Sequence, residues 1–200
     1  MKISNLLRFT SLKFAFLLLA GISIIITSTG CENDPVGNGF VVLRHDGDNL
    51  TAPVLPGGAT YEAAAKFTAG SLQNMIGDRL VEIDFFIQEI PSTCVVKVYT
   101  SNGGNSPVTE IYSSNVLASL SANSWNNHRL STPYTITNED IWIAVEFTHP
   151  SDARTVGCDP GPAVFNGDWI FDSSVGSWNP LSDVSTIDIN WNIRGNVEPQ

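Results

Sequence analysis

Three cysteines, three histidines, five tryptophans and one acidic turn are the parts of this sequence whose residue types could do chemistry. The acidic turn is 45–49, His-Asp-Gly-Asp-Asn, with Asp46 and Asp48 on either side of a glycine. Ca²⁺ prefers carboxylate and carbonyl oxygens, so Asp46, Asp48 and Asn49 are candidate ligands for this ion. The turn lacks the downstream glutamate of an EF-hand loop. Asp-Gly-Asp-Asn is also ordinary turn chemistry, so both interpretations stay open.

The tryptophans differ in their sequence context. Trp142 and Trp191 lie within apolar runs and are expected in the core. Trp125 and Trp178 each stand between serine and asparagine, and Trp169 follows Gly-Asp at the start of a strand-like run. Exposed rings stack on the apolar faces of sugars while nearby amides bind the hydroxyls. Trp125, Trp178 and Trp169 are therefore the candidate ligand-binding residues, unless these rings only cap the ends of the fold.

Catalytic motifs are missing from the sequence. It has no Gly-x-Ser-x-Gly elbow, no His-Glu-x-x-His and no Gly-rich phosphate loop. A Ser-His-Asp triad draws its members from distant positions, so His45, His128 and His149 keep a hydrolase open as an alternative. Glu82 and Asp84 share one face of an expected strand, but acidic surfaces carry many solvated carboxylates. We therefore name no catalytic residue.

Cys94 and Cys158 are an even pair once Cys31 is set aside. Cys94 lies in an alternating, strand-like run, whereas Cys158 lies in a turn-like Gly-Cys-Asp-Pro-Gly stretch. In an oxidising compartment the simplest interpretation is a disulfide between them. The alternatives are a catalytic thiol or a metal pair, whose usual spacings this sequence does not match.

The first thirty residues have the layout of an export signal. The apolar run 14–26 is short for a membrane-spanning helix, and small residues at 28–30 precede Cys31. The charges before Cys31 are all positive: Lys2, Arg8 and Lys13. This order resembles a bacterial lipoprotein signal. The resemblance implies cleavage after residue 30 and acylation of Cys31, with palmitate-type chains as a membrane anchor.

The remaining chain is strongly acidic. Residues 1–30 hold three basic residues and no acidic one, so the rest has 7 basic and 20 acidic residues, a formal charge of −13. Such a surface repels nucleic acid, which is excluded as the main partner. Residues 31–38 are polar and turn-prone, as expected of a flexible tether. The expected location is the bacterial cell envelope, as an outer-membrane lipoprotein that is surface-exposed or faces the periplasm.

Residues 39–200 carry the signals of a single all-β domain. Hydrophobic residues make up 42% of the chain, enough for a core, and 16 glycines and 11 prolines supply turns. One short helix is expected over 69–76, with Thr68 as its N-cap and Gly77 at its end. No alternation of strands and helices appears, so a β-sandwich of jelly-roll type is predicted. The nine expected strands are 40–44, 61–67, 80–90, 94–100, 108–113, 125–130, 141–148, 163–171 and 187–197.

Four stretches together resemble a known module. They are Ala64-Ala-Lys-Phe-Thr68, the run 141–149, the Gly157-Cys-Asp-Pro-Gly-Pro-Ala-Val segment followed by Gly167-Asp-Trp-Ile, and the ending 190–197. The resemblance, over roughly residues 39–198, is to a β-sandwich module of cell-surface and secreted proteins of Bacteroidetes-type bacteria. That module occurs as a lipoprotein or attached to secreted peptidases and adhesins. It implies a location and a fold, and it has no assigned chemistry.

These observations favour a lipid-anchored, secreted β-sandwich that binds or adheres at the cell surface without catalytic activity. Its partners would be the membrane, through the lipid anchor only, and a glycan or surface protein. No cofactor is required, with Ca²⁺ the one candidate. The alternatives are a carbohydrate-binding module that uses exposed tryptophans, and a hydrolase with dispersed catalytic residues.

Overall fold

A computed structural model describes residues 39–200. The predicted signal peptide, the lipidation predicted at Cys31 and the predicted tether lie outside the described residues. The described part has short helical turns at α1 (Ala69–Leu72), η1 (Gln73–Met75), η2 (Leu117–Ser119) and α2 (Leu181–Val184). The first six strands are β1 (Val41–Leu43), β2 (Val54–Leu55), β3 (Thr60–Phe67), β4 (Arg79–Ile87), β5 (Thr93–Ser101) and β6 (Thr109–Asn115). The others are β7 (Ser124–Thr135), β8 (Asp140–Thr148), β9 (Ala153–Arg154), β10 (Trp169–Asp172), β11 (Ser177–Pro180) and β12 (Ile193–Glu198).

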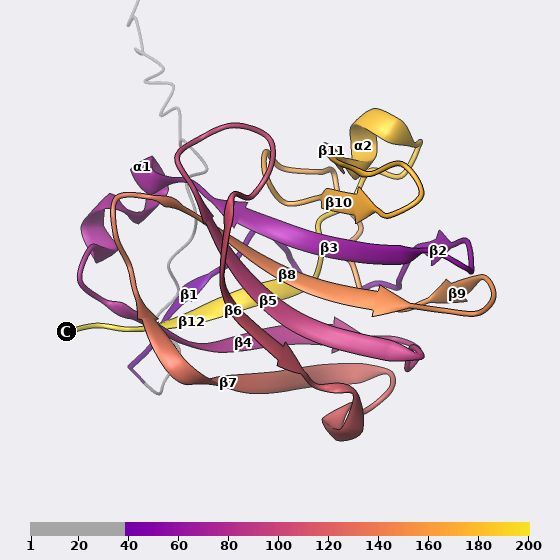
Figure 1. Ribbon diagram of the computed structural model, residues 1–200, viewed down its shortest axis with the longest axis horizontal. Helices are drawn as coiled ribbons and strands as arrows, with labels where there is room; N and C mark the ends of the chain where they lie inside the picture. The colour runs from indigo at the N-terminus through magenta and orange to yellow at the C-terminus, as the bar shows by residue number, and fades with distance from the viewer. Residues whose placement is uncertain (1–38) are drawn as a thin grey trace, which may run out of the picture.

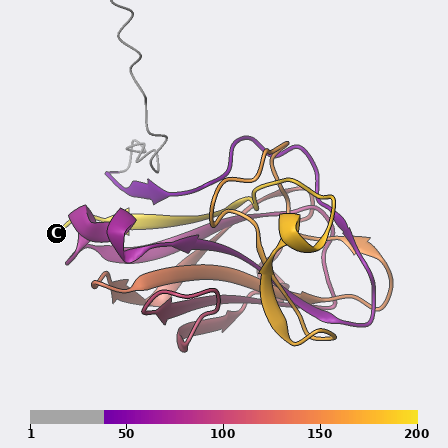
Figure 2. The ribbon, with the colours of Figure 1, turned by 90° about the horizontal axis from the view of Figure 1, so that it is seen from above.

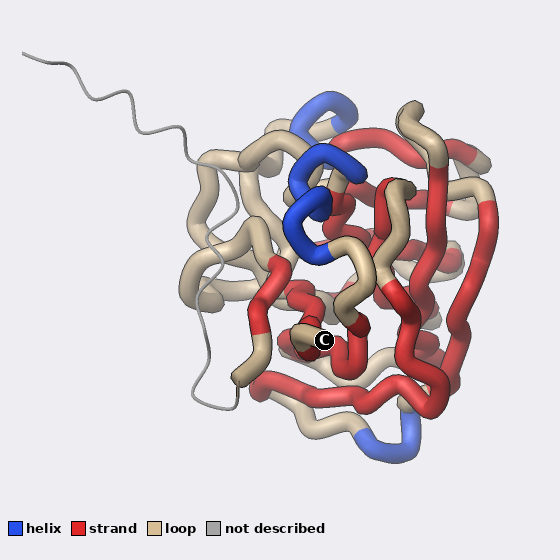
Figure 3. Tube along the Cα trace, turned by 90° about the vertical axis from the view of Figure 1, so that its left-hand side faces the viewer, coloured by secondary structure: helices blue, strands red, loops and turns tan. Residues whose placement is uncertain are grey.

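Two antiparallel sheets form the body of the molecule, as Figure 1 and the end-on view of Figure 3 show. The smaller sheet has the order β1-β12-β4-β7, and the larger has the order β11-β10-β3-β8-β5-β6. The β5–β6 and β10–β11 hairpins and the β8–β10 connection stay within the larger sheet, whereas the other connections between strands of the two sheets cross from one sheet to the other. The first and last strands, β1 and β12, lie side by side in the smaller sheet. The predicted all-β sandwich is confirmed.

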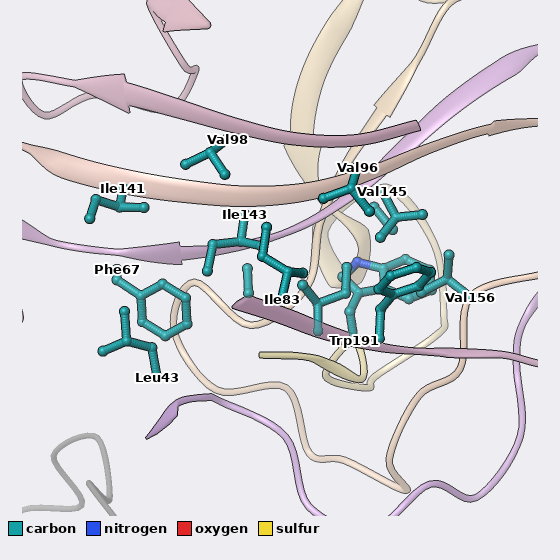
Figure 4. Close-up of a cluster of buried hydrophobic side chains, with 14 of the residues drawn as sticks. Leu43, Phe67, Ile83, Val96, Val98, Ile141, Ile143, Val145, Val156 and Trp191 are labelled. Atoms are coloured by element: carbon teal, nitrogen blue, oxygen red, sulfur yellow. The ribbon is translucent and has the colours of Figure 1, made fainter. Parts of the chain in front are cut away.

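Alternation along the strands builds the core between the sheets. In β3, Tyr61, Ala63, Ala65 and Phe67 point inward and are buried, as their period of two requires. The facing sheet contributes the inward residues of β4 and β12, and Trp191 fills one end of the core. Figure 4 shows Phe67, Ile83, Ile143 and Trp191 packed between the two layers.

The predicted helix is present in shortened form. Thr68 caps it, since its Oγ1 accepts a hydrogen bond from the Ser71 nitrogen at 3.3 Å, and a 3₁₀ turn then leads to Gly77. Gly77 has a φ of +97°, a conformation that favours glycine.

The strand predicted over 163–171 is wrong in its first half. In the structure, 163–168 is a loop and β10 begins at Trp169. The nitrogens of Ala163 and Val164 donate to side-chain oxygens of Asp188 and Asn190, at 2.6 and 2.7 Å. These side chains take the place of a neighbouring strand, so the segment forms no ladder.

Candidate functional site

Aromatic rings gather on the outer face of the larger sheet, the face turned away from the core. Trp142 of β8 and Trp169 of β10 lie 5.0 Å apart between ring centroids and are buried. The ring centroid of Trp178, on β11, lies 5.6 Å from that of Trp142 and 5.7 Å from that of Phe171. Tyr99, on β5, is the last ring of the group, with its centroid 6.5 Å from that of Trp178. Trp178, Phe171 and Tyr99 are only partly buried, so their rings line the surface.

The rings of Trp178 and Tyr99 meet across the outer face of the larger sheet. β11 and β5 are four strand positions apart, which in a flat sheet is about 19 Å at about 4.8 Å per spacing. Their ring centroids are nevertheless 6.5 Å apart. The two side chains therefore reach toward each other across the outer face, and Figure 1 shows the β10–β11 hairpin beyond β3 near α2.

An ionic cluster borders the aromatic rings on the same face. Lys97 Nζ lies 2.6 Å from Glu146 Oε2, 3.3 Å from Glu62 Oε1 and 3.8 Å from Glu110 Oε2. Tyr99 Oη donates to Glu62 Oε2 at 2.6 Å. Three neighbouring strands supply the central group, since Glu62 is on β3, Glu146 on β8 and Lys97 on β5, with Glu110 on the edge strand β6.

Partial burial sets the electrostatics of this cluster. Burial raises the pKa of Glu62, against the opposing effects of the Tyr99 hydroxyl and the Lys97 ammonium group. Burial by itself lowers the pKa of Lys97, but the hydrogen bond to Glu146 and the charges of Glu62 and Glu146 outweigh it, so the pKa is raised. The pKa of Tyr99 is raised chiefly by burial and by its bond to Glu62, so its phenol stays a donor.

A buried ion pair closes one end of the aromatic group. Lys66 Nζ lies 3.1 Å from Asp140 Oδ2, 5.1 Å from the ring centroid of Trp142, and donates to the Gly104 carbonyl at 2.7 Å. Asp140 Oδ1 also accepts from the Ala69 nitrogen at 2.9 Å. Lys66 thereby fixes the β5–β6 loop over the sheet.

Partly buried rings beside charged hydrogen-bonding groups suit a polar ligand with apolar faces, such as a sugar. Of the predicted ligand-binding residues, Trp178 lies at the surface of this site and Trp169 lies beneath it, 3% exposed. Sequence reasoning missed Tyr99, Phe171 and the cluster around Lys97. Alternation in β3, β5 and β8 indicated the face of each residue, but not that these strands are neighbours.

Trp125 lies elsewhere. It is on β7, in the smaller sheet, with 38% of its surface exposed. The Arg194 guanidinium lies 4.2 Å from its ring centroid and Phe86 packs edge-on at 5.9 Å. Two of the candidate ligand-binding residues, Trp125 and Trp178, therefore lie on different sheets and do not share one surface.

The acidic turn is occupied by the protein's own groups. Asp46 is buried, and its carboxylate lies 2.9 Å from Arg194 Nη2 and accepts from Asn192 Nδ2 at 2.6 Å. Asp48 is exposed, and Asn49 Oδ1 is turned inward, toward Gly157. The predicted Ca²⁺ site at Asp46, Asp48 and Asn49 is therefore not formed, because an arginine already neutralises Asp46. Within 39–200 no group of three or more His, Cys, Asp or Glu side chains is arranged to hold a metal ion.

The predicted disulfide is not present in the structure. Cys94 and Cys158 are both free thiols buried in the main core. Burial raises the pKa of Cys94 to about 12 and that of Cys158 to about 11. Both side chains pack as small hydrophobic groups, and an even count of cysteines did not imply that they are neighbours.

Each histidine has a structural partner. His45 stacks on Phe67 and its Nε2 lies 2.7 Å from the Lys66 carbonyl oxygen. His128 Nε2 lies 2.8 Å from the Tyr112 hydroxyl, and His149 Nε2 lies 2.7 Å from the hydroxyl of Thr155. Burial lowers the pKa of all three rings.

Between residues 39 and 200, no helix has the length and apolar character needed to cross a membrane.

No protein-family model matches the chain, and no curated protein sequence matches it. Two solved structures are similar in fold. One is a variant of the clostridial cysteine protease Cwp84 after propeptide cleavage, at 11% identity and a TM-score of 0.58. The other contains the cysteine protease and lectin-like domains of Cwp84, a surface layer associated protein of Clostridium difficile, at 13% identity and 0.53. The first alignment covers 82% of this chain and 41% of the protease chain. The second covers 70% of this chain and 32% of the other chain, so this chain spans less than half the length of either.

Proposed function

We propose that this protein is a lipid-anchored cell-surface module that binds a glycan on the aromatic outer face of its larger sheet. The proposal includes no catalytic step. The observation that carries it is the row of partly buried rings, Tyr99, Phe171 and Trp178, beside the Lys97–Glu62–Glu146 cluster. Ring faces would stack on the sugar while the ammonium and carboxylate groups bind its hydroxyls.

The fold and the export signal support the same function. The similar structure from Clostridium difficile belongs to a surface layer associated protein and includes a lectin-like domain. A signal ending in Gly30-Cys31 would place the domain in the cell envelope, as an outer-membrane lipoprotein. Several acyl chains on one cysteine give stable anchoring, where a single chain would be marginal.

Two experiments test this function. Mass spectrometry of the mature N-terminus should find Cys31 as the acylated first residue, and an unmodified N-terminus elsewhere would refute the anchor. A glycan array probed with the chain from residue 31, made soluble by Cys31→Ser, should give binding that Trp178→Ala removes. Binding to no glycan, or equal binding by the variant, would refute the site.

A further inference from the structure

Three large apolar side chains are displayed to solvent on two adjoining loops. The loops are 44–51 and 159–168, called here the loop pair, and the exposed side chains are Leu50, Val164 and Phe165. Phe165 is 84% exposed, Leu50 64% and Val164 43%. Leu50 lies on one loop and Val164 and Phe165 on the other, so the loop pair exposes apolar side chains from both of its members, as interaction surfaces often do.

Buried polar side chains hold this surface in shape. Asp159, 6% exposed, accepts hydrogen bonds from the nitrogens of Gly47, Gly161 and Asn190 at 2.8–3.0 Å. Asp159 thus joins the two loops, and a bond from the Leu50 nitrogen to the Cys158 carbonyl, at 2.8 Å, joins them again.

The segment around Phe165 is bonded on both sides. The Val164 nitrogen donates to Asn190 Oδ1 at 2.7 Å, and the Lys66 nitrogen donates to the Asn166 carbonyl at 3.0 Å. The backbone on either side of Phe165 is therefore held in place, which lowers the backbone entropy lost on contact with a partner.

The loop pair lies on the side of the domain that the chain enters. The described chain begins at Gly39, and loop 44–51 follows β1 directly along one side of the molecule (Figure 2). Gly39 follows Cys31 by eight positions, so the chain between them can span at most about 29 Å in any conformation. A domain of this size has a radius of gyration of about 15 Å. A bilayer holding Cys31 would thus face this side.

We propose that Leu50, Val164 and Phe165 form a contact surface for the bilayer that holds the anchor. This inference rests on the lipid anchor of the proposed function. Phenylalanine and leucine side chains partition into the boundary between headgroups and acyl chains. The exposed carboxylates of Asp48 and Asp188 border the surface, so it fits a zwitterionic bilayer better than an anionic one. The anchored domain then holds one orientation, with the loop pair toward the membrane.

Spin labelling of the acylated full-length protein in phosphatidylcholine–phosphatidylethanolamine vesicles tests this contact. A nitroxide is attached at Phe165→Cys and, as the matched control, at Val175→Cys, an exposed position in the β10–β11 hairpin. Cys94 and Cys158 stay unlabelled in the folded protein because they are buried and their pKa values are raised. Collisions with oxygen and with a water-soluble nickel complex report the depth of each label.

The expected result is that the label at 165 collides more with oxygen and less with nickel than the label at 175. Replacing part of the lipid by phosphatidylglycerol should weaken this difference. Flotation of the vesicles separates the two proposals. A protein that does not float refutes the anchor and the contact with it. A protein that floats while both labels collide equally with nickel refutes the contact alone.

Discussion

Replacing Lys97 with methionine keeps most of the side-chain stem and removes the ammonium group that Glu62, Glu110 and Glu146 share. The side chains of Lys97, Glu62 and Glu146 are 14%, 11% and 25% exposed. Removing one partner of a fully buried pair costs about 3–5 kcal/mol, whereas exposed pairs are worth about 0–1 kcal/mol. For this half-buried cluster we expect the free energy of unfolding to fall by about 2–4 kcal/mol at neutral pH.

The loss in the Lys97→Met variant should depend on pH. Glu62 has a raised pKa in the folded protein, so over the window between its ordinary and its raised pKa the folded state binds more protons. Stability therefore falls as pH rises through that window and is recovered on acidification. The ammonium group of Lys97 limits the rise in the pKa of Glu62, so in the Lys97→Met variant this pKa is raised further. The variant should thus approach the wild type as pH falls through that window.

Urea denaturation of both proteins at several pH values measures this difference. Arg129→Met is the matched control, because its partner Glu82 is 18% exposed and Arg129 itself is 62% exposed. It should lose less than about 1 kcal/mol. Equal losses in the two variants, or a Lys97→Met deficit that stays constant with pH, would contradict the description of this cluster.

Buried groups lead to three further predictions. Cys94 and Cys158 should not react with thiol reagents in the folded protein at pH 8, and both should react after denaturation without reductant. If neither reacts in the denatured protein, the two cysteines form a disulfide. Gly195→Ala should destabilise the fold by about 1–3 kcal/mol in thermal melts, because the new Cβ would lie 2.6 Å from Ile143 Cδ1. An unchanged melting temperature would show that the core side chains move to accommodate the methyl group. Asp159→Ala should speed hydrogen exchange in both loops of the loop pair, and unchanged protection would show that the carboxylate does not hold them.

The fold was accessible from the sequence because period-two alternation is a local property. The expected strand over 61–67 differs from β3, Thr60–Phe67, by one residue, and its inward residues are those that the sequence placed on one face. The segment 163–168 misled the same reasoning. Its apolar residues suggest a strand, but its backbone donors are taken by Asp188 and Asn190, twenty-five or more residues away.

The candidate site was less accessible, since it depends on which strands are neighbours. Glu62, Lys97 and Glu146 meet because β8 lies between β3 and β5, and no local pattern contains that order. Likewise, Trp125 and Trp178 share a sequence context but lie on different sheets. The acidic turn looked free for an ion because its arginine partner, Arg194, lies at the other end of the domain sequence.

The central claim is that sugar binds on the outer face of the larger sheet at Trp178. Its most direct test is isothermal titration of the strongest glycan from the array into wild type, Trp178→Ala and Trp125→Ala, with folding checked by near-ultraviolet circular dichroism. Because Trp178→Ala removes an aromatic contact, its Kd should rise by about tenfold or more. A tenfold rise in Kd is a loss of about 1.4 kcal/mol of binding free energy. Trp125→Ala, altered on the opposite sheet, should bind like the wild type. Undiminished binding by a folded Trp178→Ala variant, or a comparable loss in Trp125→Ala, would contradict the claim.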